Sequence, residues 1–379
     1  MAAICIFSAL YSPSMGGVER FTENVARELA GNGHDVVIVT NDTHHQGSHE
    51  VPFAGVEIWR LSCLNLLNGR YPVPVASADN YQVIKKLSCR HFDGMLINTR
   101  FYLHSLLGVR LAKCCGIRPI ILDHGSAYLS FGSPLADWAV ARYEDLVTSY
   151  IRRQSVDFCA ISEKSADWLN HFGITARGVI PNSIDAVSFR EQSTGRSFRN
   201  ELGIGNDFMI AFSGRFIPEK GISILIEMME MLDDLPVHLV AAGEGPLCGA
   251  MEESGIDKLH VVGRLKSGDI AALLMESDLF CLPSRSEGFS TALLEASACG
   301  TPSLVTDVGG ARELIPSQDC GFIEPIADPA AFAEIVRRMV PNRAGLQVMG
   351  ERCRRRVEGT CSWNTVAETL LRFMRTISD

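Results

Sequence analysis

The sequence predicts an α/β protein with two domains, each built around a parallel sheet. The chain has 379 residues, which is more than one hydrophobic core ordinarily serves. Hydrophobic residues make up 46% of the chain and charged residues only 21%, so apolar side chains suffice for two cores. Short apolar runs alternate with segments of helical periodicity, and this rhythm is typical of parallel strands joined by helices.

The first half opens with a strand, a glycine turn and a helix. The apolar run 4–7 predicts a buried strand, and the turn at 12–17 leads into a helix over 18–30. This is a Rossmann-like opening, but it lacks the G-x-G-x-x-G pattern of dinucleotide-binding proteins. Gly16 and Gly17 let backbone amides approach a ligand at the helix start, although an ordinary tight turn explains them equally well.

The same rhythm continues through the first half. Strands are expected at 94–99, 119–122 and 157–161, with a helix over 101–115. His124 follows the strand 119–122 and therefore lies at a carboxyl end. A lone His is usually structural, but this edge of a parallel sheet is where ligands bind, so His124 is a candidate ligand-binding residue.

Two other segments of the first half have an unusual amino-acid composition. Residues 59–75 are apolar and aromatic and include two Arg; a packed loop is the first interpretation, and docking to a membrane interface or to an acceptor are the alternatives. The segment 44–49 holds three His without helical spacing or companion acids, so we predict a polar loop there and not a metal site.

In the second half, two cations lie in a loop flanked by glycines. A strand over 208–213 leads into the loop 214–221, and a helix follows to about residue 232. Arg215 and Lys220 thus precede a helix N-terminus, where N–H groups and the helix dipole attract anions. A solvated loop is the alternative.

A second loop-and-helix unit carries two carboxylates. The run 279–282 predicts a strand, Ser290 or Thr291 can cap the following helix, and Gly300 ends it. Glu287 in the loop and Glu295 in the helix are at most about 12 Å apart along the backbone.

That separation suits two hydroxyl-rich ends of one extended ligand with an anion between them. The amides of Gly288, Phe289 and Ser290 at the helix N-terminus would attract the anion. In the alternative interpretation, Glu295 belongs to the solvated stripe of an amphipathic helix.

The pattern E-G-F-x-x-x-L-L-E-A followed by G-T-P, over residues 287–302, closely resembles the signature of glycosyltransferase family 4. Members are retaining, nucleotide-sugar-dependent enzymes of the GT-B fold. The resemblance implies that Glu287 binds sugar hydroxyls, that the amides of 288–290 touch the distal phosphate and sugar, and that Glu295 binds the ribose. The chain departs from the family in having Ser290 where Gly is frequent.

Other segments extend the resemblance. G-R-x-x-x-E-K-G at 214–221 implies that Arg215 and Lys220 bind the diphosphate. Residues 261–265 resemble the segment whose backbone reads the base, which adds Arg264 as a weaker candidate.

In the first half, Gly16 and Gly17 match the family's G-G-x-E-R turn, which lies across from the donor phosphates. His124 matches a His that contacts the donor sugar and the distal phosphate.

The resemblance implies two Rossmann-like domains whose parallel sheets face each other across a cleft. We predict an acceptor domain over 1–187 and a nucleotide-sugar donor domain over 188–362. A C-terminal helix over 363–379 is expected to cross back to the first domain.

The predicted function is transfer of a hexose from a UDP-sugar or GDP-sugar to a saccharide or lipid-linked glycan, with retention of configuration and without a metal or other cofactor. Family precedent favours synthesis of a bacterial surface polysaccharide such as O-antigen, capsule or exopolysaccharide. A GT-B nucleotide-sugar epimerase and a non-catalytic nucleotide-sugar-binding subunit are the alternatives. The missing fingerprint argues against a NAD-dependent dehydrogenase.

Composition also bears on partners and location. A net charge of −9 argues against nucleic acid. The 12 Cys are scattered without a C-x-x-C pair, as in a reducing compartment. No apolar run approaches the roughly 18 residues of a membrane-spanning helix, and the opening lacks a basic leader. We therefore predict a cytoplasmic protein, with peripheral association at the inner face of the membrane as a further expectation.

Overall fold

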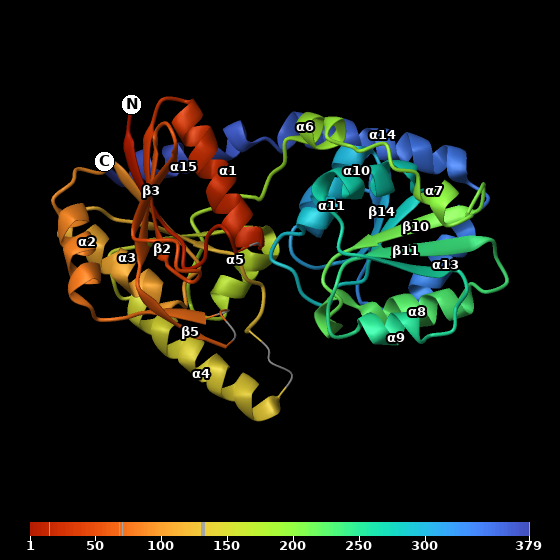
Figure 1. Ribbon diagram of the computed structural model, residues 1–379, viewed down its shortest axis with the longest axis horizontal. Coiled ribbons are helices and arrows are strands. Elements are labelled where there is room, and N and C mark those ends of the chain that lie inside the picture. Colours follow the sequence, from red (N-terminus) through yellow and green to blue (C-terminus); the bar gives the residue numbers. More distant parts are fainter. Residues whose placement is uncertain (15, 68, 70, 130–132, 379) are drawn as a thin grey trace. The chain divides into compact units, whose positions relative to one another are not determined.

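The computed structural model describes residues 1–14, 16–67, 69, 71–129 and 133–378 (Figure 1). It divides into two compact units, the first made of Met1–Asn182 with Trp363–Asp379 and the second of Ser183–Ser362. The first unit ends at Asn182, whereas we predicted the boundary after residue 187. Helix α6 (Ala186–Glu191) explains the difference, because it packs against helices of the second unit.

The first unit is built on a seven-stranded sheet in the order β3-β4-β2-β1-β7-β8-β9. Every neighbouring pair is parallel except β3 and β4, which are antiparallel. The strands are β1 (Ala3–Phe7), β2 (Asp35–Asn41), β3 (His49–Phe53), β4 (Val56–Leu61), β7 (Gly94–Asn98), β8 (Ile120–Asp123) and β9 (Asp157–Ala160). The strands predicted at 4–7, 94–99, 119–122 and 157–161 are all present to within a residue or so.

Helices cover both faces of this sheet (Figure 1). They are α1 (Gly17–Gly31), α2 (Ala78–Ser88), α3 (Leu103–Cys114), α4 (Pro134–Ile151), α5 (Glu163–Asn170) and α15 (Trp363–Ser378). The C-terminal helix α15 packs against α1 and β7, as predicted for a helix that returns to the first domain. Gly94 permits this contact, because a Cβ there would lie 2.4 Å from the sulfur of Met374.

The prediction of a packed loop over 59–75 is wrong. Trp59 lies in β4 and is 7% exposed, and β5 (Cys63–Leu66) pairs antiparallel with β6 (Tyr71–Pro74) in a separate hairpin. Residues 68 and 70 lie outside the described part of the chain. The two Pro of this segment, which suggest a loop, are tolerated because a two-stranded ribbon has only edge strands.

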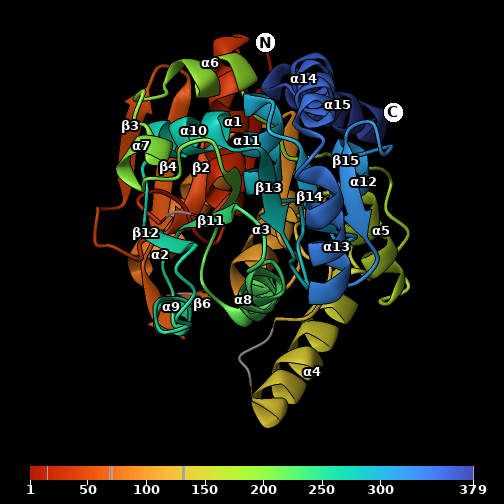
Figure 2. The same ribbon diagram turned by 90° about the vertical axis from the view of Figure 1, so that its right-hand side faces the viewer.

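The second unit is built on a six-stranded, wholly parallel sheet in the order β12-β11-β10-β13-β14-β15 (Figure 2). The strands are β10 (Phe208–Ser213), β11 (Val237–Ala242), β12 (Leu259–Gly263), β13 (Leu279–Leu282), β14 (Ser303–Thr306) and β15 (Gly321–Glu324). All their carboxyl ends lie along one edge, so the loops that follow them are neighbours.

The helices of this unit lie on both faces of its sheet (Figures 1 and 2). After α6 they are α7 (Phe198–Glu201), α8 (Ile222–Met231), α9 (Cys248–Glu252), α10 (Ser267–Glu276), α11 (Thr291–Cys299), α12 (Ala311–Leu314), α13 (Pro329–Met339) and α14 (Arg343–Thr360). A single 3₁₀ turn, η1 (Pro218–Lys220), precedes α8. Across the described residues, no helix combines the length and apolarity needed to cross a bilayer.

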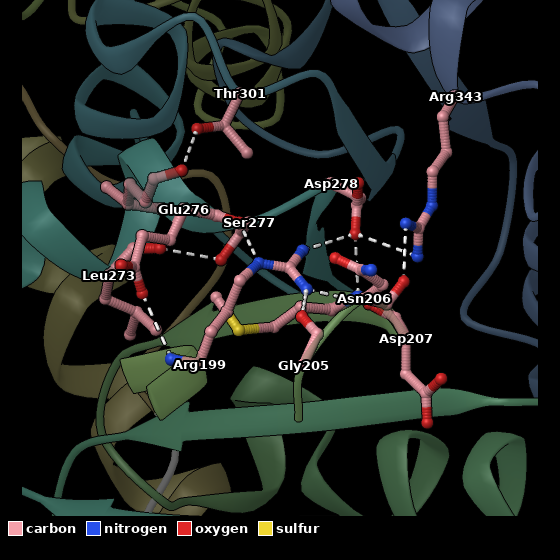
Figure 3. A network of polar contacts seen from close by, with 12 residues as sticks. Arg199, Gly205, Asn206, Asp207, Leu273, Glu276, Ser277, Asp278, Thr301 and Arg343 are labelled. Carbon is pink, nitrogen blue, oxygen red and sulfur yellow. Dashed lines mark hydrogen bonds and ion pairs between the residues drawn. The ribbon is translucent and has the colours of Figure 1, made fainter. Parts of the chain in front are cut away.

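Arg199 connects the amino-terminal ends of β10 and β13, opposite the edge at which the carboxyl ends of these strands lie (Figure 3). Its guanidinium donates to Asp278 Oδ2 at 2.7 Å, to the carbonyls of Gly205 and Asp207 at 3.0 and 2.8 Å, and to that of Glu276 at 3.0 Å. Asp278 also accepts the backbone N–H of Met209 at 2.9 Å, at the start of β10. A guanidinium with all these acceptors matched stabilises the unit, and the network is far from any candidate site residue along each strand.

In the first unit, His104 is fully buried on α3 and donates Nε2–H to the carbonyl of Val39 at 3.0 Å. Its Nδ1 has no partner among the described residues, so protonation would bury an unpaired charge. Burial accordingly lowers the pKa of the His104 imidazole to about 4.

This depressed pKa predicts an acid-sensitive first unit. In the unfolded chain His104 binds a proton below about pH 6.5, whereas in the folded chain it stays neutral down to about pH 4. The free energy of unfolding therefore falls as the pH is lowered through this window. We expect the free energy of unfolding to fall by about 2 kcal/mol more in the native chain than in His104→Gln between pH 7.5 and 5.0. Tryptophan fluorescence in urea measures this unit alone, because all 4 Trp lie in it. Equal pH dependence in the two proteins would contradict the assignment.

Candidate active site

Three loops at the carboxyl edge of the second unit's sheet form the candidate donor site. They follow the adjacent strands β10, β13 and β14 and cover residues 214–221, 283–290 and 307–310. Six of the eight candidates of this unit lie in the first two loops; Glu295 lies on α11 and Arg264 follows β12.

Lys220 and Glu287 meet directly between the first two loops. Lys220 Nζ lies 2.5 Å from Glu287 Oε1, and the two side chains are 18% and 12% exposed. The same Oε1 accepts the hydroxyl proton of Ser284, which is fully buried, at 2.7 Å. The carboxylate is thus fixed by a cation and a buried hydroxyl.

Gly221 allows the two loops to approach backbone to backbone. Its φ is +72°, and a Cβ on it would lie 2.1 Å from the carbonyl oxygen of Pro283. Beside it, the backbone N–H of Arg285 donates to the carbonyl of Glu219 at 2.8 Å. The Lys220–Glu287 pair therefore depends on the absence of a side chain at residue 221.

Helix α11 begins inside this site. Ser290 caps it by accepting the backbone N–H of Leu293 at 3.2 Å, and Gly300 ends it with φ +74°. The predicted cap and end are confirmed. The amides of Gly288 and Phe289 thus lie at the positive end of a helix dipole.

The third loop packs beneath these residues. A Cβ on Gly309 would lie 2.7 Å from the carbonyl oxygen of Gly288, and one on Gly310 would lie 2.3 Å from the ring of Phe289. The pair of glycines thus leaves the space in which the Gly288–Phe289 backbone lies. We assigned no role to these two glycines from the sequence, although V-G-G after a strand is a signal that could have found them.

The remaining candidates of this unit lie apart from the pair. Arg215 follows β10, is exposed, and has no side-chain partner among the described residues. Arg264 is exposed after β12, two strands away from β10. Glu295 is half-buried on α11, and its charge adds to burial in raising the pKa of the Cys299 thiol, one turn further on, to about 12.

Together, these residues determine which kind of ligand the sheet edge could bind. The exposed guanidinium of Arg215, Lys220 and a helix N-terminus place positive groups at a single sheet edge, whereas Glu287 supplies an acceptor for hydroxyl groups. The edge is therefore suited to an anion that carries a polyol.

In the first unit, the helix that follows the glycine turn is connected to His124 by hydrogen bonds through Asn98. Gly16 precedes α1, and its carbonyl accepts the backbone N–H of Arg20 at 3.1 Å. One turn further along α1, Thr22 accepts the side-chain amide of Asn98 at 2.8 Å, and Asn98 contacts His124 Nε2 at 3.0 Å.

This chain of bonds identifies the protonated nitrogen of His124. Thr22 donates its own hydroxyl proton to the carbonyl of Val18 at 2.7 Å, so it accepts from the Asn98 amide nitrogen. The Asn98 oxygen therefore faces His124 and accepts Nε2–H. Burial lowers the pKa of His124 to about 3, so the ring is neutral at physiological pH and Nδ1 keeps its lone pair. His124 thus acts as a neutral hydrogen-bonding group, held by Asn98, which the sequence did not single out.

The two units, each built on a largely parallel sheet with helices on both faces, have the GT-B fold of glycosyltransferases. The structure of Anabaena HepE in complex with UDP has this fold: the two superpose with a TM-score of 0.73 over 99% of this chain and 100% of that chain, at 17% identity.

Comparison of the sequence with models of known families shows which family the chain belongs to. Residues 196–356 match the family described as "Glycosyl transferases group 1", and residues 15–187 match "Glycosyltransferase Family 4". The chain belongs to these glycosyltransferases, and the resemblance read from the motifs is confirmed.

Two curated relatives resemble the chain over part of its length. MMP alpha-(1->4)-mannosyltransferase of Mycolicibacterium hassiacum is 30% identical over 57% of this chain and 53% of its own length. The putative teichuronic acid biosynthesis glycosyltransferase TuaC of Bacillus subtilis is 33% identical over 47% of this chain and 45% of its own length. The chain thus spans about half the length of these relatives.

Proposed function

We propose that this glycosyltransferase moves a hexose from a UDP-sugar or GDP-sugar to a saccharide or lipid-linked glycan, with retention of configuration and without a metal ion. The observation that carries the proposal is the Lys220–Glu287 pair at the N-terminus of α11. At this edge of the second unit, a cation for the diphosphate, amides for its distal phosphate and a carboxylate for the sugar hydroxyls lie side by side.

Bond cleavage at the sugar C1 creates an oxocarbenium-like sugar and a leaving diphosphate that gains charge. Arg215, Lys220 and the amides of residues 288–290 would stabilise that charge. Glu287 would accept from the sugar, and neutral His124 would accept a sugar hydroxyl at Nδ1, which has no proton to give to the distal phosphate. No residue among these is a suitable covalent nucleophile.

At the nucleoside end, Glu295 would hold the ribose and the segment around Arg264 the base. Gly16 and Gly17 would offer amides to the donor from the first unit.

Nucleotide binding tests the proposal most directly. UDP, GDP, UDP-glucose and GDP-mannose would be compared for thermal stabilisation, which at 100 times the dissociation constant is about 2.7 kcal/mol. We expect one nucleoside diphosphate and its sugar to stabilise the protein equally well with and without EDTA. No stabilisation by any of the four, or strict dependence on a divalent ion, would contradict the proposal. Product analysis without acceptor also separates transfer from epimerisation, because an epimerase changes the donor sugar alone.

Glu295→Ala is expected to weaken nucleoside diphosphate binding, because charged hydrogen bonds to the ribose contribute about 1.5–3 kcal/mol. Isothermal calorimetry with the bound nucleotide measures the change. Glu227→Ala, which removes an exposed carboxylate on α8, is the control and should bind normally. Equal affinity of both variants would reject the ribose role.

For the acceptor we propose a lipid-linked glycan of a bacterial surface polysaccharide, in line with the teichuronic acid assignment of the similar Bacillus protein. The first unit has an exposed apolar stripe on α4, which extends away from the sheet of that unit (Figure 2). Leu135, Trp138 and Leu146 share this stripe at helical spacing with the exposed Arg142, and the exposed Arg153 follows in the turn after the helix. A helix face with Trp, Leu and Arg suits the surface of an anionic bilayer.

The β5–β6 hairpin adds to this surface. Leu64, Leu66 and Leu67 are exposed on it, and it lies against α4 because the rings of Tyr71 and Tyr143 pack edge to face at 5.7 Å. We therefore propose peripheral association with the membrane through α4 and the hairpin, which would place a cytoplasmic enzyme at the inner face.

Binding to vesicles of phosphatidylcholine with phosphatidylglycerol tests this association. The double variant Trp138→Gln/Leu146→Gln should lose at least about 10-fold in affinity, because each apolar side chain buried in lipid contributes about 1.5–3 kcal/mol. Tyr81→Ser, which removes an exposed aromatic ring from α2, is the control and should bind as the native protein does. Unchanged binding of the double variant would reject the surface.

A further inference from the structure

A buried ionic cluster lies beneath the loop that carries His124. Arg100, Asp123 and Glu144 are each fully buried. Arg100 Nη1 donates to both oxygens of Asp123 at 3.1 and 3.2 Å, and Nη2 donates to Glu144 Oε2 at 2.9 Å. The three residues come from the ends of β7 and β8 and from the middle of α4.

Stability alone does not account for this cluster. Two carboxylates and one guanidinium are desolvated in the folded protein, and this burial raises the pKa of both carboxyl groups. The Arg100 Nε–H also has no partner among the described residues. Apolar side chains of similar volume often stabilise a core at least as well as such a group, so a geometric role is the better explanation.

The cluster holds the backbone on both sides of the His124 ring. The carboxylate of Asp123 accepts the backbone N–H of His124. Glu144 Oε1 accepts the backbone N–H of Leu129 at 3.0 Å, further along the same loop. Arg100 follows Asn98 by two residues, and Asn98 Oδ1 accepts Nε2–H of His124.

We propose that Arg100 and Glu144 are positioning residues for His124: they hold the 124–129 loop and Asn98 so that the imidazole presents Nδ1 to the donor. Neither side chain touches the reacting atoms. This inference rests on the proposed function, because it assumes that His124 contacts the donor.

A double-mutant cycle tests it. The assay is hydrolysis of UDP-glucose or GDP-mannose without acceptor, whichever the enzyme turns over. Glu144→Gln should lower kcat/KM by about 10–100-fold, the effect of misplacing a binding group by about 1 Å. In a His124→Ala background, the same change should lower kcat/KM by less than about 3-fold, because the group it positions is gone. Equal losses in both backgrounds would overturn the proposal.

Two further variants separate positioning from folding. Ile151→Val removes a buried methyl from the same helix, two turns from Glu144, and should leave kcat/KM unchanged. Arg100→Lys keeps the charge but loses the fork that reaches both carboxylates, and it should lose activity in the same His124-dependent way if Glu144→Gln does not fold.

NMR of the His124 ring provides a second test that needs no substrate. In protein labelled with ¹⁵N-histidine, the ring signal that disappears in His124→Ala should show the Nε2–H tautomer in the native protein and a tautomer mixture in Glu144→Gln. An unchanged single tautomer in Glu144→Gln would overturn the proposal. If His124→Ala alone keeps full activity, the role of His124 in the proposed function fails; if His124→Ala is impaired and Glu144→Gln is not, only the positioning inference fails.

Discussion

Arg215→Ala or Lys220→Ala is expected to lower turnover by about 10²–10³-fold, a loss of roughly 3–4 kcal/mol in transition-state stabilisation. Both cations follow β10 at the edge where α11 begins, so both would face the charge that develops on the leaving diphosphate. Steady-state kinetics with the donor measure the loss. Near-normal turnover in both variants would reject the phosphate assignment.

The two variants should differ in stability. Arg215 is exposed and makes no side-chain bond among the described residues, so its removal should change the midpoint of thermal unfolding little. Lys220→Ala removes the cation that is paired with the largely buried carboxylate of Glu287 and should destabilise the second unit. Arg352→Ala, which removes an exposed cation from α14, is the control and should change neither turnover nor stability by much. Equal midpoints for Arg215→Ala and Lys220→Ala would argue against a functional Lys220–Glu287 pair.

Gly221→Ala is expected to destabilise the second unit by about 2–4 kcal/mol and to weaken nucleotide binding together with stability. The new Cβ would lie 2.1 Å from the carbonyl oxygen of Pro283, which is backbone and cannot turn aside. The loop of Lys220 and the loop of Glu287 would therefore be pushed apart. Chemical denaturation and calorimetry with the nucleoside diphosphate measure the two effects.

Gly255→Ala is the matched control for this variant. Gly255 has φ +71°, close to the +72° of Gly221, but a Cβ on it would meet no atom within 4 Å. It therefore measures the cost of the left-handed backbone alone, about 1 kcal/mol, without the contact between loops. If the two variants lose the same stability and both bind nucleotide normally, the approach of the two loops is not what Gly221 provides.

Much of the local structure could be read from the sequence. Ser290 at the start of α11 and Gly300 at its end are expected from the sequence to cap and end this helix, and the structure has them there. These features depend on a few consecutive residues, because a cap is a bond between a side chain and an amide two or three residues away. The motifs around Glu287 and Lys220 were likewise enough to identify the family.

The hairpin at 63–74 could not be read in the same way. Whether an apolar segment becomes a loop or a strand depends on which strand is free to pair with it. That partner lies elsewhere in the fold, and here β4 joins β2 while β5 and β6 pair with each other.

The sequence by itself determined the two α/β units, the helix ends and the residues that make up the family motifs, because these follow from periodicity and short-range hydrogen bonds. Only the tertiary structure decided that Glu287 pairs with Lys220, that Ser284 and Gly221 support that pair, and that Asn98 sets the tautomer of His124. Lys220 and Glu287 are 67 residues apart. The distance between such side chains is set by which parallel strands are neighbours and how closely their loops pack, and neither property is local in sequence.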